Sequence, residues 1–187
     1  VICSSSGGLP ILVLILSELP SNFPASVLIV KHMPEVFTKS LAAHLDEKTN
    51  LRVKEAQQGD VIEPGRVYIA PGNFHMAVEK KRMRRTIKAI IGLNKSPQVH
   101  GFRPSIDVTM KSVAEVYGKK VIGVILTGMG EDGADGMEAI KINHGKTIAQ
   151  DEATSAIFDM PKKVIERGYA DYILPAFKIS QEIIRLV

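Results

Sequence analysis

The stretch Cys3-Ser4-Ser5-Ser6-Gly7-Gly8 decides the fold expected for this chain of 187 residues. It follows the apolar pair Val1-Ile2 and precedes the apolar run Ile11–Leu16. We therefore expect a buried strand that ends in a turn of small residues and leads into a helix. Such a turn places hydroxyl groups at the carboxyl edge of a sheet, where the helix directs free N–H groups and a partial positive charge. The stretch indicates a site that stabilises an oxyanion or holds a phosphate.

Apolar runs of strand length alternate with helical patterns along the rest of the chain. Residues 27–30 and 67–70 are expected to form buried strands, and 121–126 is apolar on both faces, as a central parallel strand requires. Further short strands are expected at 52–56, 146–150 and 170–174. Helices are expected at 8–19, 36–48, 105–117, 134–143, 161–167 and 178–186.

Two more strand-like runs, 74–79 and 85–91, surround the basic residues 80–82 and predict an antiparallel hairpin with a basic tip. Together with the alternating strands and helices, they predict an α/β fold. We expect a doubly wound, mostly parallel sheet with helices on both faces and an attached antiparallel β-hairpin. Residues 1–187 would form one domain.

The composition narrows the class of protein. The chain is 45% hydrophobic and 24% charged, as in an ordinary globular protein. Its single cysteine, Cys3, excludes an internal disulfide and a cysteine-based zinc site and fits a reducing cytosol. The apolar surroundings of Cys3 predict a buried, unreactive thiol.

Charge and hydropathy predict neither a nucleic-acid partner nor insertion into a membrane. The net charge of +4 is too modest to establish nucleic-acid binding. The longest apolar run, Leu9–Leu16, is too short to span a bilayer. The first residues lack the basic region and cleavage site of a signal peptide. We expect a cytoplasmic protein.

Polar residues follow three of the expected parallel strands and suggest a catalytic triad. They are the serines 4–6, His32 and Asp132. A serine hydroxyl needs a base to become a nucleophile, and that base is usually a histidine oriented by a carboxylate. One of the three serines would attack, His32 would be the base and Asp132 would orient it. Each has a plainer alternative: a tight turn, a loop histidine and a helix cap.

The segment Gly128–Gly133 supports a different hypothesis, because it matches the dinucleotide fingerprint G-x-G-x-x-G between a strand and a helix. Asp151 then stands where a ribose-binding acid belongs. However, Glu131 and Asp132 lie inside the loop and would repel a diphosphate. A phosphate- or nucleotide-binding domain stays the alternative to a hydrolase. No two of the five histidines share one element at metal-ligand spacing, so we predict no metal.

Six blocks, in order, resemble the catalytic domain of the bacterial chemotaxis protein-glutamate methylesterases, the CheB family. The resemblance covers nearly the whole chain, and six blocks in sequence are highly specific. The blocks are Ser4-Ser5-Ser6-Gly7-Gly8, Lys31-His32-Met33-Pro34 with Phe37-Thr38, Tyr68-Ile69-Ala70-Pro71-Gly72, Arg103-Pro104-Ser105-Ile106-Asp107, the run from Leu126 to Ala134, and Ala149-Gln150-Asp151-Glu152-Ala153-Thr154.

This resemblance implies a serine hydrolase without a cofactor. The matching positions make Ser5 the nucleophile, His32 the base and Asp132 the orienting carboxylate. The family removes methyl groups from glutamate methyl esters on the cytoplasmic helices of chemoreceptors, releasing methanol, and many members deamidate receptor glutamines. Family members usually carry an N-terminal receiver domain that covers the active site. We expect that domain upstream of Val1, which lies inside an expected strand.

For the reaction itself, backbone N–H groups of Ser6 and Met129 are expected to hold the oxyanion, while Gly128 and Gly130 allow the backbone to approach the substrate closely. Arg103 and the basic stretch 80–85 are candidates for contacts with acidic receptor helices. A general serine esterase acting on small molecules is a further alternative.

Overall fold

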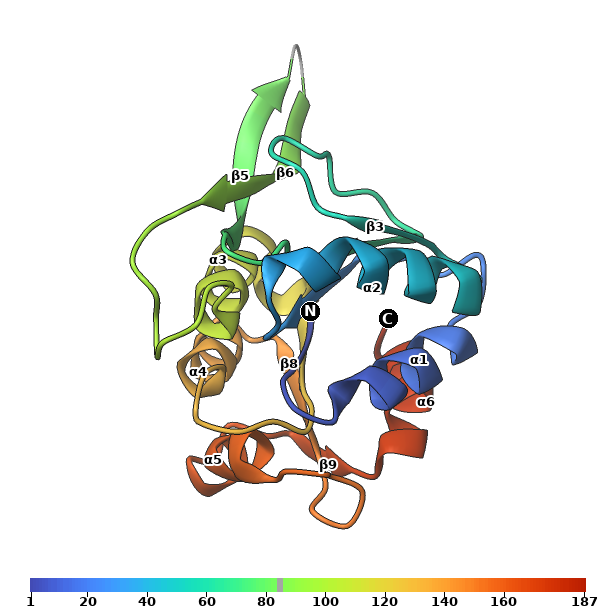
Figure 1. The fold of residues 1–187 in the computed structure, drawn as a ribbon, viewed down its shortest axis with the longest axis vertical. Coiled ribbons are helices and arrows are strands. Elements are labelled where there is room, and N and C mark those ends of the chain that lie inside the picture. The colour runs from blue at the N-terminus through green and yellow to red at the C-terminus, as the bar shows by residue number, and fades with distance from the viewer. Residues whose placement is uncertain (84–85) are drawn as a thin grey trace.

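The computed structural model, which describes residues 1–83 and 86–187, is built around a seven-stranded sheet (Figure 1). All neighbouring strands in it are parallel, in the order β3-β4-β2-β1-β7-β8-β9. The strands are β1 (Ile2–Ser4), β2 (Val27–Lys31), β3 (Arg52–Glu55), β4 (Arg66–Ile69), β7 (Ile122–Ile125), β8 (Lys146–Gln150) and β9 (Tyr172–Leu174).

The strand order reverses direction beside β1. The strands that come first after β1 in the chain, β2 to β4, all lie on one side of it. The later strands β7, β8 and β9 lie on the other side. Open parallel sheets bind ligands at the carboxyl ends of the strands at such a switch point. The β1–β7 junction is therefore where the fold favours a site.

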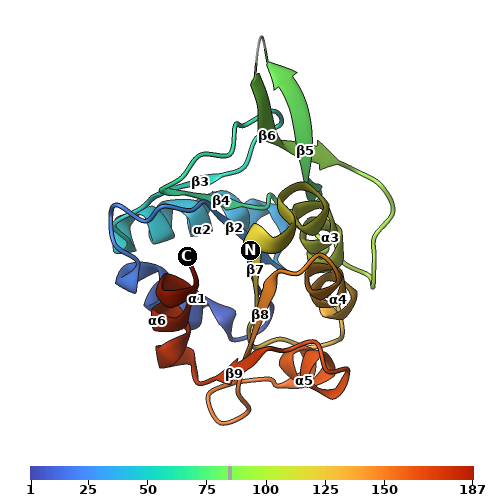
Figure 2. The same ribbon diagram turned by 180° about the vertical axis from the view of Figure 1, so that it is seen from behind.

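Helices cover both faces of the sheet, as the sequence predicts (Figures 1 and 2). Successive strand residues point to opposite faces, so Ile2 and Ile29 join one core cluster while Cys3 and Val30 join the other. The helices of the first face are α1 (Gly8–Glu18), α2 (Glu35–Lys48) and α6 (Ala176–Leu186). Those of the second are α3 (Ile106–Tyr117), α4 (Ala134–Ile142) and α5 (Asp159–Glu166). This confirms the predicted fold class.

Cys3 is fully buried, and burial raises the pKa of its thiol, as expected for an unreactive cysteine.

The antiparallel hairpin extends away from the layered body, with β5 (His75–Met83) paired to β6 (Thr86–Asn94) (Figure 1). The prediction that residues 80–82 form its tip is wrong, because Lys80, Lys81 and Arg82 lie within β5 and pair with β6. The last two residues of the basic stretch, 84 and 85, lie outside the described residues. Lys80, Lys81 and Arg82 are all exposed, and a strand that is exposed on both faces shows no apolar alternation in its sequence.

Smaller differences concern element ends. Ser105 precedes α3 as its N-cap and accepts a hydrogen bond from the Val108 N–H group, so α3 begins one residue later than expected. The last helix begins at Ala176 rather than 178, directly after Pro175, which starts helices well because it lacks an N–H group. A short 3₁₀ turn, Gly118–Lys120, precedes β7.

Among the helices of the described residues, none is both long and apolar enough to cross a bilayer.

Candidate active site

The ends of three adjacent strands bring the predicted triad residues to one edge of the sheet. Ser5 follows β1, His32 follows β2, and Asp132 lies in the loop after β7, with β1 between the other two strands. Backbone hydrogen bonds continue the sheet into these loops: the Ser5 N–H group donates to the Thr127 carbonyl (3.0 Å) and the His32 N–H group to the Ser4 carbonyl (3.1 Å). The positions of these residues are therefore set by the sheet itself.

His32 is anchored to Asp132 by a hydrogen bond of 2.8 Å between Nε2 and Oδ2. The imidazole also stacks on Phe102, with ring centroids 3.7 Å apart and planes within 2° of parallel. Its other nitrogen, Nδ1, is buried and has no hydrogen-bond partner among the described residues. Because the proton of a neutral imidazole stays on the nitrogen facing the carboxylate, Nδ1 carries the free lone pair. Nδ1 is the basic atom of this site.

Asp132 accepts four hydrogen bonds from the residues that the structure describes. Besides His32, its donors are the Ser105 hydroxyl (2.9 Å) and the N–H groups of Ile106 (2.8 Å) and Asp107 (3.0 Å). The carboxylate thus faces the positive end of α3. Burial alone would raise the pKa of Asp132, but the hydrogen bonds from His32 and the α3 backbone outweigh it and lower that pKa. Asp132 therefore stays ionised and can support an imidazolium.

Asp107, in α3, accepts hydrogen bonds from the start of α4, just as Asp132, before α4, accepts them from the start of α3. Its Oδ1 accepts from the N–H groups of Gly133 (3.0 Å) and Gly136 (2.6 Å) at the start of α4. Each of the two carboxylates thus binds the first N–H groups of the other's helix. Burial and the nearby Asp132 charge raise the pKa of Asp107 to about 6. No local pattern in the sequence points to this role for Asp107.

An Asp107→Asn variant is expected to keep the fold and to change how its stability varies with pH. The folded pKa of Asp107 is raised to about 6 from 3.8. The folded state then binds this proton more tightly, so the free energy of unfolding falls as pH rises from about 4 to about 6. Asparagine keeps an acceptor for the α4 N–H groups but carries no charge. The free energy of unfolding should therefore fall less over this pH range in the variant than in the parent. Urea unfolding across this pH range measures it.

Asp135→Asn is the matched control, because the pKa of Asp135 is lowered from its usual value by Lys111 and Arg167 despite opposing desolvation. The stabilisation from its charge is complete above about pH 4, so its removal should leave the decrease between about pH 4 and about pH 6 nearly unchanged. A larger decrease in Asp107→Asn than in the parent would contradict the prediction.

The three serines differ in their access to solvent. Ser4 is fully buried and its hydroxyl has no hydrogen-bond partner among the residues described. Ser6 is exposed, whereas Ser5 is 6% exposed. In residues 1–83 and 86–187, no hydrogen bond joins the Ser5 hydroxyl to His32. Catalytic contacts of this kind commonly tighten only when substrate binds. That Ser5 is the nucleophile stays a prediction.

The expected oxyanion donors are free. The N–H groups of Ser6 and Met129 have no acceptor in the part of the chain that the structure describes. Gly128 lies against the turn that carries Ser5, since a Cβ at this position would lie 2.7 Å from Ser5 Cβ. Gly130 has open space around it and a φ of 91°, which favours glycine. The structure thus brings this loop next to Ser5.

A Gly128→Ala change is expected to reduce turnover about 100-fold, because displacing a reacting group by about 1 Å has that effect. The added methyl would also lie 2.2 Å from Met160 Sδ, so the turn at Ser5 and the Met160 side chain must both shift. Steady-state turnover and thermal unfolding would be compared with Gly59→Ala. Gly59 has no neighbour within 4 Å of the added atom, although, unlike Gly128, it has a positive φ of 83°. Equal turnover in the two variants would contradict the prediction.

Arg103 holds the loop that leads to α3. Its Nη1 donates to the carbonyls of Lys95 and Ser96, both at 3.0 Å, and its Nη2 donates to Asn73 Oδ1 at 2.6 Å. These contacts give Arg103 a role in ordering the loop that carries Phe102. The expected substrate contact of Arg103 stays a prediction.

The start of α4 offers no place for a diphosphate. The N–H groups of Gly133 and Gly136, which would bind the phosphates, already donate to the Asp107 carboxylate. The Asp132 side chain fills the corresponding position at α3. This arrangement argues against the nucleotide-binding alternative for Gly128–Gly133.

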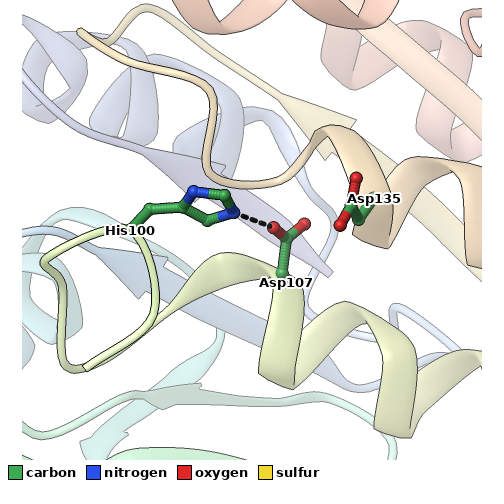
Figure 3. Close-up of side chains that lie close together, drawn as sticks. All are labelled: His100, Asp107 and Asp135. Carbon is green, nitrogen blue, oxygen red and sulfur yellow. Dashed lines mark ion pairs between the residues drawn. The ribbon is translucent and has the colours of Figure 1, made fainter. Parts of the chain in front are cut away.

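His100, Asp107 and Asp135 gather beside this region, with potential metal-ligating atoms within 4.8 Å of one another (Figure 3). However, Asp135 already pairs with Arg167 at 3.0 Å and with Lys111 at 3.4 Å. A divalent cation would lie against these two positive charges. The group is accounted for as an ion-pair network.

Comparison with known proteins yields one consistent family. The family model described as CheB methylesterase matches residues 1–183. The chain is 49% identical over 187 residues to a protein-glutamate methylesterase/protein-glutamine glutaminase of Thermotoga maritima, covering all of this chain and 53% of that protein. A protein of the same name from Pyrococcus abyssi is 47% identical over 186 residues, which are 50% of its length. The chain thus spans about half the length of the curated relatives it matches.

A solved structure shows the same fold. The crystal structure of the Thermotoga maritima CheB methylesterase catalytic domain matches with a TM-score of 0.94 at 49% identity, covering 100% of this chain and 96% of that one.

Proposed function

Because the chain belongs to the CheB methylesterase family, we propose that it hydrolyses glutamate methyl esters of proteins and deamidates protein glutamines at the carboxyl edge of its sheet. The observation that carries this proposal is the free Nδ1 of His32. That atom is basic, buried and held in place by Asp132 and Phe102, and the His32 backbone is hydrogen-bonded to Ser4, the residue before Ser5. These features are what a serine hydrolase needs.

In the proposed reaction, Ser5 Oγ attacks the ester carbonyl carbon while His32 Nδ1 takes the hydroxyl proton. Asp132 stabilises the resulting imidazolium. The tetrahedral oxyanion accepts hydrogen bonds from the N–H groups of Ser6 and Met129, and each such donor contributes about 3 kcal/mol. Collapse of the intermediate expels methanol, which receives the proton from His32.

The glutamyl ester on Ser5 is then hydrolysed by water, with His32 Nδ1 again acting as the base. A glutamine side chain follows the same two steps: its amide nitrogen takes the proton from His32 and leaves as ammonia, and hydrolysis of the acyl group on Ser5 yields glutamate. His32 Nδ1 accepts or donates the proton in every step of this reaction.

The proposed substrates are the methylated cytoplasmic helices of chemoreceptors, acted on in the cytoplasm during chemotactic adaptation. Positive charge on the hairpin supports an acidic partner: Lys80, Lys81 and Arg82 are exposed on β5. We propose Arg103 as a second contact with the acidic receptor helix. The relatives are about twice as long as this chain, which leaves room in a whole protein for the regulatory receiver domain.

The proposal is tested by methanol release from a methyl-esterified chemoreceptor fragment, with a simple small-molecule methyl ester as the comparison substrate. We expect much faster turnover of the receptor, and mass spectrometry should show conversion of receptor glutamine to glutamate. Equal turnover of both esters would favour a general esterase. No release at all would contradict the proposal.

A further inference from the structure

Lys31 contacts the turn of residues 5–8, which carries the proposed nucleophile and is called the nucleophile turn below. It is the last residue of β2, immediately before His32, and its Nζ donates to the Ser5 carbonyl at 2.8 Å. The same carbonyl also accepts from the Gly8 N–H group at 3.3 Å. The side chain therefore reaches across to β1 rather than into solvent, and contacts the peptide that follows the proposed nucleophile.

The ammonium of Lys31 has no compensating carboxylate. In residues 1–83 and 86–187 it makes no ion pair, and the Ser5 carbonyl is its single hydrogen-bond acceptor. Lys31 is half-buried, and this burial lowers the pKa of its ammonium. Burying a cation without a counter-charge costs free energy, so stability alone does not account for its position.

The peptide that Lys31 binds is the one that provides the first oxyanion donor. The Ser5 carbonyl and the Ser6 N–H group belong to one peptide unit. A positive charge on the carbonyl oxygen polarises that unit and strengthens its N–H group as a donor, as in cooperative hydrogen-bond chains. The Ser6 N–H group has no other acceptor among the described residues, so this strengthening is available to a bound oxyanion.

We propose that Lys31 is a positioning residue for the oxyanion site: through the Ser5 carbonyl it holds the nucleophile turn and strengthens the Ser6 N–H group as a donor to the tetrahedral intermediate. This inference rests on the proposed function. Because the oxyanion exists only after attack on the carbonyl, the effect belongs to the transition state rather than to substrate binding.

Lys31→Met, which keeps most of the side chain but removes the charge, provides the test. We expect kcat to fall about tenfold with KM unchanged, less than the 10²- to 10³-fold effect of removing an entire donor. Affinity for a boronic acid, which forms a tetrahedral adduct with a serine hydroxyl, should fall by the same factor. Lys31→Arg should retain more activity than Lys31→Met, and Lys39→Met on the exposed surface of α2 should match the parent.

The outcomes separate this inference from the proposed function. If the parent is active and Lys31→Met has unchanged kcat and boronate affinity, the inference is wrong and the proposed function stands. A raised KM with unchanged kcat would assign Lys31 to substrate binding and would also overturn it. If the parent releases no methanol, the proposed function fails. Boronate affinity, which needs no turnover, then still decides whether Lys31 supports the tetrahedral adduct.

Discussion

A Ser5→Ala chain is expected to lose about 10⁵- to 10⁶-fold in turnover of glutamate methyl esters, the loss seen when a serine hydrolase loses its nucleophile. The methyl group of alanine fits where the small hydroxymethyl group lies, so thermal unfolding should change little. Methanol release from a methylated receptor fragment, followed over hours, measures the residual rate.

Ser4→Ala and Ser6→Ala are the matched controls, because they remove the neighbouring hydroxyls from the same turn. Ser4 is fully buried and Ser6 is exposed. Ser6→Ala should retain nearly full activity, since its proposed contribution comes from the backbone. A folded Ser5→Ala protein with activity near that of the parent would assign the attack to a different group.

An Asp132→Asn chain is expected to lose about 10⁴-fold in turnover. Its amide oxygen, in the place of Oδ1, can still accept from the Ser105 hydroxyl and the Asp107 N–H group. Its amide nitrogen, in the place of Oδ2, would face His32 Nε2 as a donor and leave the Ile106 N–H group without its acceptor. His32 would then hold its proton on Nδ1, the atom that must accept the serine proton. The prediction therefore concerns the tautomer of His32, and turnover is measured with the same receptor substrate.

Ser105→Ala gives a graded comparison, because it removes one of the four hydrogen bonds to Asp132 and leaves the carboxylate in place. Its effect should be much smaller than that of Asp132→Asn. Two-dimensional NMR of the imidazole nitrogens should show protonation at Nε2 in the parent and at Nδ1 in Asp132→Asn. Undiminished turnover in Asp132→Asn would exclude an orienting role for this residue.

Much of the fold could be predicted because local patterns and tertiary structure agree. The run 121–126 is apolar on both faces and becomes central strand β7, while the small-residue turn after Val1-Ile2 becomes the β1–α1 junction. The triad hypothesis followed from the same logic, since the carboxyl ends of parallel strands must meet at one edge. That geometry explains why residues 5, 32 and 132 come together from distant positions.

Other features could not be predicted because they depend on contacts between distant elements. The exchange of helix caps between Asp107 and Asp132 requires the N-termini of α3 and α4 to face each other, which no local pattern encodes. The free nitrogen of His32 depends on which side of the ring meets Asp132. The contact of Lys31 with Ser5 depends on the pairing of β2 with β1. The hairpin itself was predicted, but its outer part, residues 80–82, lacks the apolar alternation that would mark it as strand.

The central claim, that Ser5 is a nucleophile activated by His32, is tested most directly by labelling with a fluorophosphonate, which forms a stable adduct with an activated serine. Intact mass and fragment sequencing of the labelled chain identify the modified residue. We predict one adduct, on Ser5, and loss of labelling in His32→Gln. An adduct on another serine, or undiminished labelling in His32→Gln, would contradict the claim.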